Sequence, residues 1–315
     1  METPVVVRVE HLSHRYSTRW AIRNINFEIY QQGVLGLVGS NGAGKSTTMN
    51  IMCGVLNQTE GQVYINGINF RDAPLRAKKN IGFLPQHPPL YVDLTVNEYL
   101  RYCAELRSIP PRKIRAAVEE AKEKVGITRH GKRVVKFLSG GYQQRVGIAQ
   151  AIIHGPGFVV LDEPTNGLDP NQIVEIRHLI KEIARDRSVL LSTHILSEVE
   201  ATCDHVKMIE EGRLVFSGTM AEFNNHLQPD TFLVSFCRPP AKMELEAIPG
   251  VSRAERLEGS ENTFRLAFIA GDEVTCRVVE HSVANGWGLR EISIERPSLD
   301  AIFAQLSGKT REEEA

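Results

Sequence analysis

A glycine-rich stretch with one lysine is the part of this chain whose residue types point most directly to chemistry. Residues Gly39–Thr47 fit the pattern G-x-x-x-x-G-K-[ST], between an expected buried strand, Val34–Val38, and an expected helix, Lys45–Gly54. In that context the loop amides and the helix dipole favour the binding of phosphate groups. The alternative is a glycine-rich turn before an ordinary helix. The residues predicted to bind a nucleotide here are Gly39, Ser40, Asn41, Gly42, Ala43, Gly44, Lys45, Ser46 and Thr47.

Three kinds of side chain in this stretch have different expected tasks. Gly42 and Gly44 let the backbone approach the phosphates closely. Lys45 is expected to reach the β- and γ-phosphates, and the Ser46 hydroxyl is expected to bind Mg²⁺. A phosphate loop of this kind predicts a nucleoside triphosphatase without saying which one.

Two adjacent carboxylates follow a second apolar strand much later in the chain. Residues Phe158–Leu161 are all apolar and are followed by Asp162, Glu163 and Pro164. Because open α/β sheets bind their ligands at the carboxyl ends of their strands, we expect Asp162 to hold Mg²⁺. Glu163 is then expected to be the base that takes a proton from the attacking water. The alternative is an acidic strand end that begins a loop.

A second helix start with bare glycines lies between these two regions. Ser139, Gly140 and Gly141 precede an expected helix, Tyr142–Ile153; Ser139 can cap this helix, and the glycines leave its first amides open. This indicates a second phosphate contact, although one phosphate loop already surrounds its own nucleotide. The economical arrangement is a two-fold dimer, in which each Ser139 region closes over the nucleotide held by the other subunit's phosphate loop.

The elements that must position these residues alternate between strands and helices. The first hundred residues mix short strands with one helix, and a helical block with Val96–Arg107 and Arg112–Val125 follows. After residue 138 the order is helix, strand, helix, strand, which predicts a mostly parallel sheet covered by helices. The further expected elements are Val5–Val9, Ile25–Ile29, Gln62–Ile65, Ile81–Leu84, Gln172–Ala184 and Val189–Ser192.

Length and composition are compatible with this interpretation without selecting it. The 315 residues, 42% of them hydrophobic, favour two domains, and the formal net charge of −1 gives no electrostatic reason to expect nucleic acid. The five cysteines form no C-x-x-C pair, so neither a disulfide framework nor a zinc site is indicated. The N-terminus lacks a signal pattern, and no apolar run approaches the roughly 18 residues of a membrane helix, so we expect a cytoplasmic protein.

Taken in order, these motifs resemble those of the nucleotide-binding subunits of ATP-binding cassette (ABC) transporters. The resemblance spans Val5–Thr219 and includes the phosphate loop, Gln86 of the Q-loop, the Leu138–Gly141 signature and the Asp162–Glu163 pair, together with two further residues. Those are Asp169 of the D-loop and the switch histidine, His194.

The resemblance implies roles for residues that the pattern alone does not explain. Tyr16 would stack on adenine, the alternative being an aromatic ring packed under a strand. Gln86 would touch Mg²⁺ and the attacking water and signal to a membrane partner, which would press a short helix near His87–Tyr91; the alternative there is a plain loop. Asp169 would cross a dimer interface, and His194 would contact the γ-phosphate and orient Glu163.

A change in composition at Pro229 indicates a second, smaller domain. The expected order of strand, helix, two strands, helix and strand is that of a ferredoxin-like α+β fold. Ser298 can cap a last helix, and the ending Arg296–Phe303 is similar to the tail of ABC-2 type ATPases. The expected domains are 1–228 for nucleotide binding, with a helical subdomain at about 88–155, then 229–306 as an accessory domain and 307–315 as a disordered tail.

The sequence therefore predicts an α/β P-loop ATPase that dimerises around two Mg·ATP and drives a separate ABC-2 type permease. The resemblance places it on the cytoplasmic face of the inner or plasma membrane, in contact with the membrane only through the permease, and suggests export. Two rivals are an ABC ATPase acting on ribosomes or DNA and a non-hydrolysing regulatory module. A single unsplit cassette without a basic patch argues against the first, and intact Glu163 and His194 argue against the second.

Overall fold

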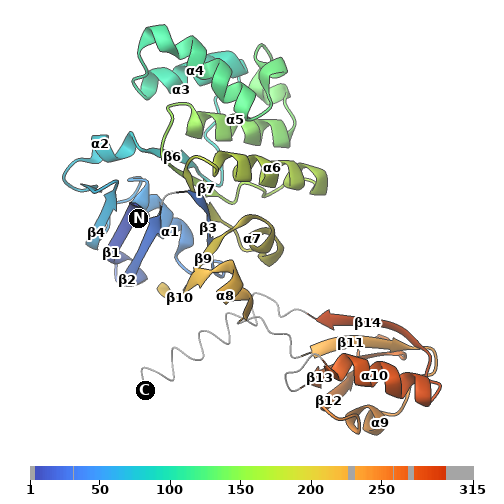
Figure 1. Cartoon of the computed structure of the whole chain (residues 1–315). Coiled ribbons are helices and arrows are strands. Elements are labelled where there is room, and N and C mark those ends of the chain that lie inside the picture. The colour runs from blue at the N-terminus through green and yellow to red at the C-terminus, as the bar shows by residue number, and fades with distance from the viewer. Residues whose placement is uncertain (1–3, 31, 226–230, 258, 269–272, 296–315) are drawn as a thin grey trace. The chain divides into compact units, whose positions relative to one another are not determined.

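The computed structural model describes residues 4–30, 32–225, 231–257, 259–268 and 273–295 (Figure 1). The chain divides into two compact units, the first ending at Met220 and the second beginning at Ala221. In the described residues, no helix is both long enough and apolar enough to span a bilayer. The two units are described separately below.

A six-stranded sheet forms the centre of the first unit. Its order is β10-β9-β3-β8-β7-β6; the five strands from β9 to β6 run parallel, and only β10 is antiparallel to its neighbour. Every residue of β7 and β8 is buried, as expected for parallel strands covered on both faces. The strands are β3 (Gly33–Val38), β6 (Ile81–Leu84), β7 (Phe158–Asp162), β8 (Ser188–Ser192), β9 (His205–Glu210) and β10 (Arg213–Thr219).

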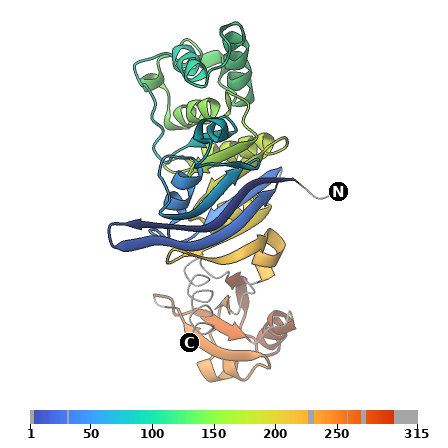
Figure 2. The same ribbon diagram turned by 90° about the vertical axis from the view of Figure 1, so that its left-hand side faces the viewer.

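An antiparallel sheet lies against the first one, with the order β2-β1-β4-β5. Figure 2 shows the first two strands as a long paired ribbon. Helix α1 (Lys45–Met52) shares one apolar core with both sheets: Leu12 and Ile22, Met49 of the helix, and Phe158 and Leu190 are fully buried in it. The strands are β1 (Val5–Tyr16), β2 (Arg19–Tyr30), β4 (Glu60–Ile65) and β5 (Ile68–Asn69).

The helical block and the connecting helices complete this unit. Helices α3 and α4 lie together at one end of it, beside α5 (Figure 1). Thr95 and Glu98 form a reciprocal capping box that starts α3. The helices are α2 (Pro74–Lys78), α3 (Val96–Leu106), α4 (Pro111–Lys124), α5 (Gly140–Ile152), α6 (Pro170–Ile183) and α7 (Leu196–Thr202), with short 3-10 turns η1 (Thr128–His130) and η2 (Val135–Phe137).

The second unit has a four-stranded antiparallel sheet with the order β12-β13-β11-β14 and two helices between its strands. This is the ferredoxin-like arrangement that the sequence predicts. Alternate residues Phe232, Val234 and Phe236 are fully buried in its core, as a half-covered sheet requires. The elements are α8 (Met220–Asn225), β11 (Thr231–Phe236), α9 (Lys242–Glu246), β12 (Val251–Arg256), β13 (Thr263–Phe268), α10 (Glu273–Ala284) and β14 (Leu289–Glu295); the helix expected after Ser298 lies outside the described residues.

Candidate functional site

The phosphate loop connects the end of β3 to the start of α1. Its last residue, Gly44, has φ +111°, in the left-handed region, and a Cβ there would lie 2.5 Å from Cγ2 of Ile22. Only glycine fits this position, which lets the chain turn sharply into α1 against the antiparallel sheet. The helix has no acidic residue in its first turn and no side-chain cap, so its first amides stay open for an anion.

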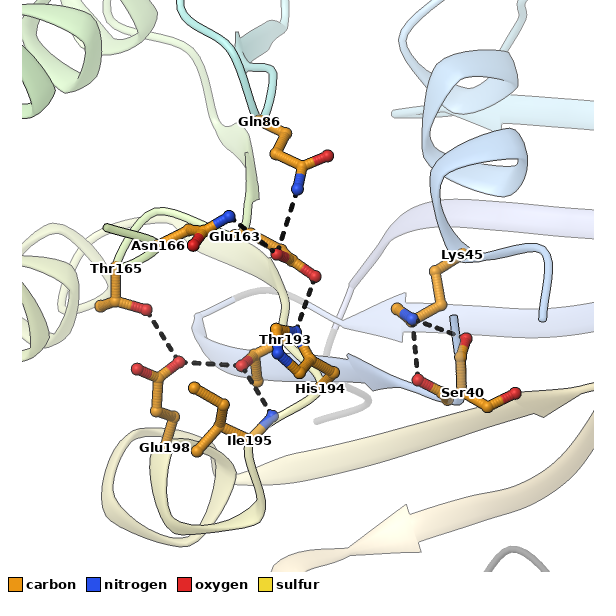
Figure 3. Close-up of polar contacts among 11 residues, drawn as sticks. Ser40, Lys45, Gln86, Glu163, Thr165, Asn166, Thr193, His194, Ile195 and Glu198 are labelled. Atoms are coloured by element: carbon orange, nitrogen blue, oxygen red, sulfur yellow. Dashed lines mark hydrogen bonds and ion pairs between the residues drawn. The ribbon is translucent and has the colours of Figure 1, made fainter. Parts of the chain in front are cut away.

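Lys45 begins α1, and its ammonium turns back to the loop. Its Nζ donates to the carbonyl oxygens of Gly39 at 2.7 Å and of Ser40 at 3.0 Å, and the residue is 6% exposed (Figure 3). Burial lowers the pKa of Lys45, while the carboxylates of Glu163, Asp162 and Glu210 raise it. A buried cation with carbonyl partners is a suitable ligand for a phosphate oxygen.

A cavity of about 720 Å³ opens beside this loop. Tyr16 lines it and is 53% exposed, so its ring lies at the mouth of the cavity and not under a strand. Trp20 supplies a second aromatic side chain. The volume and the lining fit a nucleotide whose phosphates rest on the loop and whose base meets the aromatic rings. The loop residues in the lining are Ser40, Asn41, Gly42, Ala43 and Thr47.

Asp162 ends the buried strand β7, and the parallel register places it opposite Ser192 of β8. It is 6% exposed, and its pKa is raised chiefly by burial and also by the Glu163 charge. The hydroxyls of Ser192 and Ser46 and the ammonium of Lys45 lower the pKa. The structure thus brings together Asp162 and Ser46, the two oxygen donors predicted for Mg²⁺, and oxygen ligands are those that Mg²⁺ prefers.

Glu163 lies at the meeting point of three loops that follow parallel strands. Its Oε1 is 2.9 Å from Nδ1 of His194, and its Oε2 accepts from Nε2 of Gln86 at 3.2 Å (Figure 3). Asn166 adds a long contact of 3.5 Å to Oε2. Glu163 also has φ +46°, an unusual backbone state for a non-glycine residue. Backbone strain of this kind persists where the surroundings hold a residue in place, and it is frequent at functional sites.

The signature and D-loop residues are placed elsewhere. Ser139, Gly140 and Asp169 are exposed, and within the described part of the chain none of them, nor Gly141, lines the cavity at the phosphate loop. Ser139 occupies the N-cap position of α5, but its side chain makes no capping hydrogen bond, so that expectation is wrong. Asp169 caps α6 instead, since its Oδ1 accepts from the backbone N–H of Gln172 at 3.0 Å.

Comparisons with known proteins agree with this geometry. The family model "ABC transporter" matches residues 22–166. The uncharacterized ABC transporter ATP-binding protein YxlF of Bacillus subtilis is 33% identical over 83% of this chain and 86% of its own length. The chain belongs to the ATP-binding proteins of ABC transporters. The bacitracin transport ATP-binding protein BcrA of Bacillus licheniformis is 37% identical over 67% of this chain and 68% of its own length.

The solved structures give the same result for the first unit of this ABC ATP-binding protein. The structure of cbiO1 from Clostridium perfringens, part of the ABC transporter complex cbiONQ, has a TM-score of 0.65 at 29% identity. It covers 71% of this chain and 92% of its own. The predicted fold class, a P-loop ATPase domain with helical and ferredoxin-like additions, is confirmed, and the protein binds and hydrolyses ATP.

Sequence reasoning missed a carboxylate that holds the phosphate loop of this ABC ATP-binding protein. Glu210, at the end of β9, accepts from the Ser40 hydroxyl at 2.8 and 2.9 Å and from the Ser40 N–H at 3.3 Å. It is separated from Ser40 by 170 positions. In the sequence Glu210 is only an acidic residue at the end of the stretch His205–Glu210, which forms β9 and lies outside the predicted strands. Asn166 and Glu198 were missed as well.

Replacing Lys45 by alanine tests the phosphate site. Each hydrogen bond to a charged phosphate is worth about 1.5–3 kcal/mol, so ATP affinity should fall by about 10- to 150-fold for one lost contact and by more for two. Titration calorimetry of the purified full-length chain measures this. Lys113→Ala, on the exposed side of α4, is the matched control and should bind normally. Wild-type affinity in Lys45→Ala would contradict the assignment.

Proposed function

We propose that two copies of this chain close around two Mg·ATP and drive a separate ABC-2 type membrane permease from the cytoplasmic face of the membrane. The observation that carries the catalytic part is the position of Glu163, which contacts Gln86 and His194 from neighbouring strand ends. A carboxylate held in this way can take a proton from a water molecule, with His194 orienting it. Gln86 reaches the same carboxylate and can report whether the site is filled.

The residues present fit a magnesium ion. Asp162 and Ser46 would hold it, and Gln86, an exposed side chain near Glu163, would complete the protein ligands. When bound, Mg²⁺ would neutralise negative charge on the β- and γ-phosphates. The protein's own contribution is to bind the phosphates through Lys45 and the loop amides, and to keep Glu163 ready as a base.

The exposed N-terminus of α5 supports the dimer, because no residue of that helix start lines the nucleotide cavity of its own copy. Gly140 begins α5 with an N-terminus that no side chain caps, and it is exposed together with Asp169. Neither Gly140 nor Asp169 is among the residues that line the cavity at the phosphate loop of the same copy. We therefore infer that Ser139, Gly140 and Gly141 complete the nucleotide site of a second copy, with Asp169 at the interface between the two copies.

We assign to the permease a groove beside β6, in place of the expected site at Gln86 and His87–Tyr91, none of which lines this groove. It encloses about 850 Å³, and its lining includes Val55, Leu75 and Leu106, which are 65%, 78% and 66% exposed. Phe83 of β6 also lines it, and Gln86 follows on the loop after this strand. A short amphipathic helix of the permease would cover these apolar side chains. It would also press on β6, the strand that precedes the Gln86 loop.

The domain boundaries and the direction of transport belong to the same proposal. We assign residues 1–228 to nucleotide binding, with the helical subdomain at about 88–155, and 229–306 to an accessory role; this boundary follows α8, whereas the two compact units divide before it, at Met220. Relatives such as BcrA are named as ATP-binding proteins of bacitracin transport, which supports an ABC-2 type export system. In this proposal the permease selects the transported substrate, so the sequence of the ATPase subunit does not identify it.

Replacing Glu163 by glutamine tests the catalytic role. The amide keeps the size of the side chain but cannot accept a proton, so turnover should fall by roughly 10²–10⁴ while ATP still binds. Phosphate release and size-exclusion chromatography with ATP measure both properties, and we expect a stable dimer. Glu182→Gln, an exposed site on α6, is the matched control. Undiminished turnover in Glu163→Gln would remove Glu163 from this role.

Replacing Leu106 by glutamate tests the docking groove. Replacing one of the three exposed apolar side chains of the groove by a carboxylate removes apolar contact area, so binding of the permease should weaken, whereas ATP binding by the isolated subunit should not change. Co-purification from detergent-solubilised membranes, with identification of the bound polytopic protein, gives the measurement. Met243→Glu, at an 81% exposed site in the second unit, is the control. If Leu106→Glu recovers as much permease as the wild type, the groove is not the docking site.

A further inference from the structure

Glu198 is a buried carboxylate that the proposed mechanism does not use. It lies in the first turn of α7 and is 2% exposed. Among the described residues, buried acids are few, and this one lies next to the two loops that carry Glu163 and His194. Burial of a carboxylate is costly unless hydrogen bonds or a counter-ion compensate it. The hydrogen-bond partners and the counter-ion of Glu198 therefore indicate what this buried carboxylate contributes.

One oxygen of Glu198 connects the two loops. Its Oε2 accepts from Oγ1 of Thr165 at 2.8 Å and from Oγ1 of Thr193 at 2.8 Å (Figure 3). Thr165 is two residues after Glu163, and Thr193 directly precedes His194. Both threonines are buried, at 7% and 2% exposure. The carboxylate therefore ties together the loop that follows β7 and the loop that follows β8.

The hydrogen bonds of this cluster have a fixed direction. An ionised carboxylate only accepts, so both hydroxyl protons are committed to Glu198. Thr193 Oγ1 is then free to accept from the backbone N–H of Ile195, at 3.1 Å. This fixes the side chain of Thr193 and the backbone on both sides of His194. The hydrogen bonds to Oε2 of Glu198 thus hold the two loops in one arrangement.

The other oxygen of Glu198 is less well compensated. Its Oε1 is 3.7 Å from Nη2 of Arg177 on α6, and within the described residues it has no hydrogen-bond partner. The same holds for Nε of Arg177. A well-packed apolar residue would avoid this cost. The contribution of the carboxylate is therefore the pair of hydrogen bonds to Thr165 and Thr193, which join the two loops.

We propose that Glu198 is a positioning residue, which holds the Thr165 and Thr193 loops so that Glu163 and His194 stay in hydrogen-bond contact. This rests on the roles proposed above for Glu163 and His194. The contact between them is 2.9 Å, and it spans the same two loops that Glu198 joins. Since a misplacement of about 1 Å can cost about 10²-fold in rate, a loose connection between the loops would lower turnover strongly.

The test uses full-length Glu198→Ala in single-turnover ATP hydrolysis. We expect the rate to fall by about 10²-fold with ATP affinity unchanged, because the phosphate loop is on another strand. In a Glu163→Gln background the same change should have almost no further effect, since Glu198 acts through Glu163. Glu182→Gln should retain the wild-type rate. A residue with a merely structural role would instead lower ATP affinity and would slow both backgrounds equally.

Threonine variants decide the matter if Glu198→Ala does not fold. Thr165→Ser keeps the hydroxyl and should keep the rate, whereas Thr165→Val removes it and should slow hydrolysis. Equal rates for these two variants, a wild-type rate in Glu198→Ala, or equal slowing in the Glu163→Gln background would each overturn the proposal. If Glu163→Gln itself hydrolyses ATP at the wild-type rate, the proposed role of Glu163 fails, which is a separate result.

Discussion

Parallel pairing of buried strands is the constraint on which the rest of this structure depends. Strands β3, β8, β7 and β6 run in the same direction, so their carboxyl ends meet at one edge of the sheet. Asp162 is the last residue of β7, Gln86 and His194 lie two residues after β6 and β8, and Lys45 follows β3 at the end of the phosphate loop. Every residue of β7 and β8 is buried, as parallel strands covered on both faces require. The apolar strands thus determine where the charges lie.

The site carries one buried ammonium, Lys45. Burial lowers its pKa, and the carboxylates of Glu163, Asp162 and Glu210 oppose this shift. Glu210 accepts from Ser40 and Glu163 accepts from Gln86, while the hydroxyls of Ser192 and Ser46 lower the pKa of Asp162. These donors limit the repulsion between the acids. A nucleoside triphosphate would add further negative charge, which a divalent cation held by Asp162 and Ser46, as proposed above, would offset.

The sequence revealed those parts of the site whose residues are close together in the chain. The phosphate loop could be predicted because strand, glycines and helix follow one another within about twenty residues, a local pattern with a physical reason. Glu210 and Glu198 could not, because their partners Ser40 and Thr165 come from distant loops that only the folded sheet brings together. Strand β1 runs to Tyr16, well beyond the predicted Val5–Val9, since its register shifts after Val9 and the alternation of apolar residues is lost there.

The two helix starts that follow Ser139 and Asp169 differ in a way that the dimer proposal explains. Asp169 satisfies the first amides of α6 with its own carboxylate, whereas Ser139 leaves those of α5 without a side-chain cap. The two helix starts lie close together: a Cβ on Gly141 of α5 would be only 2.6 Å from Oε1 of Gln172 on α6. Each charged hydrogen bond that the γ-phosphate would form across the proposed interface is worth about 1.5–3 kcal/mol, so the loss of several on hydrolysis would be enough to reopen the proposed dimer.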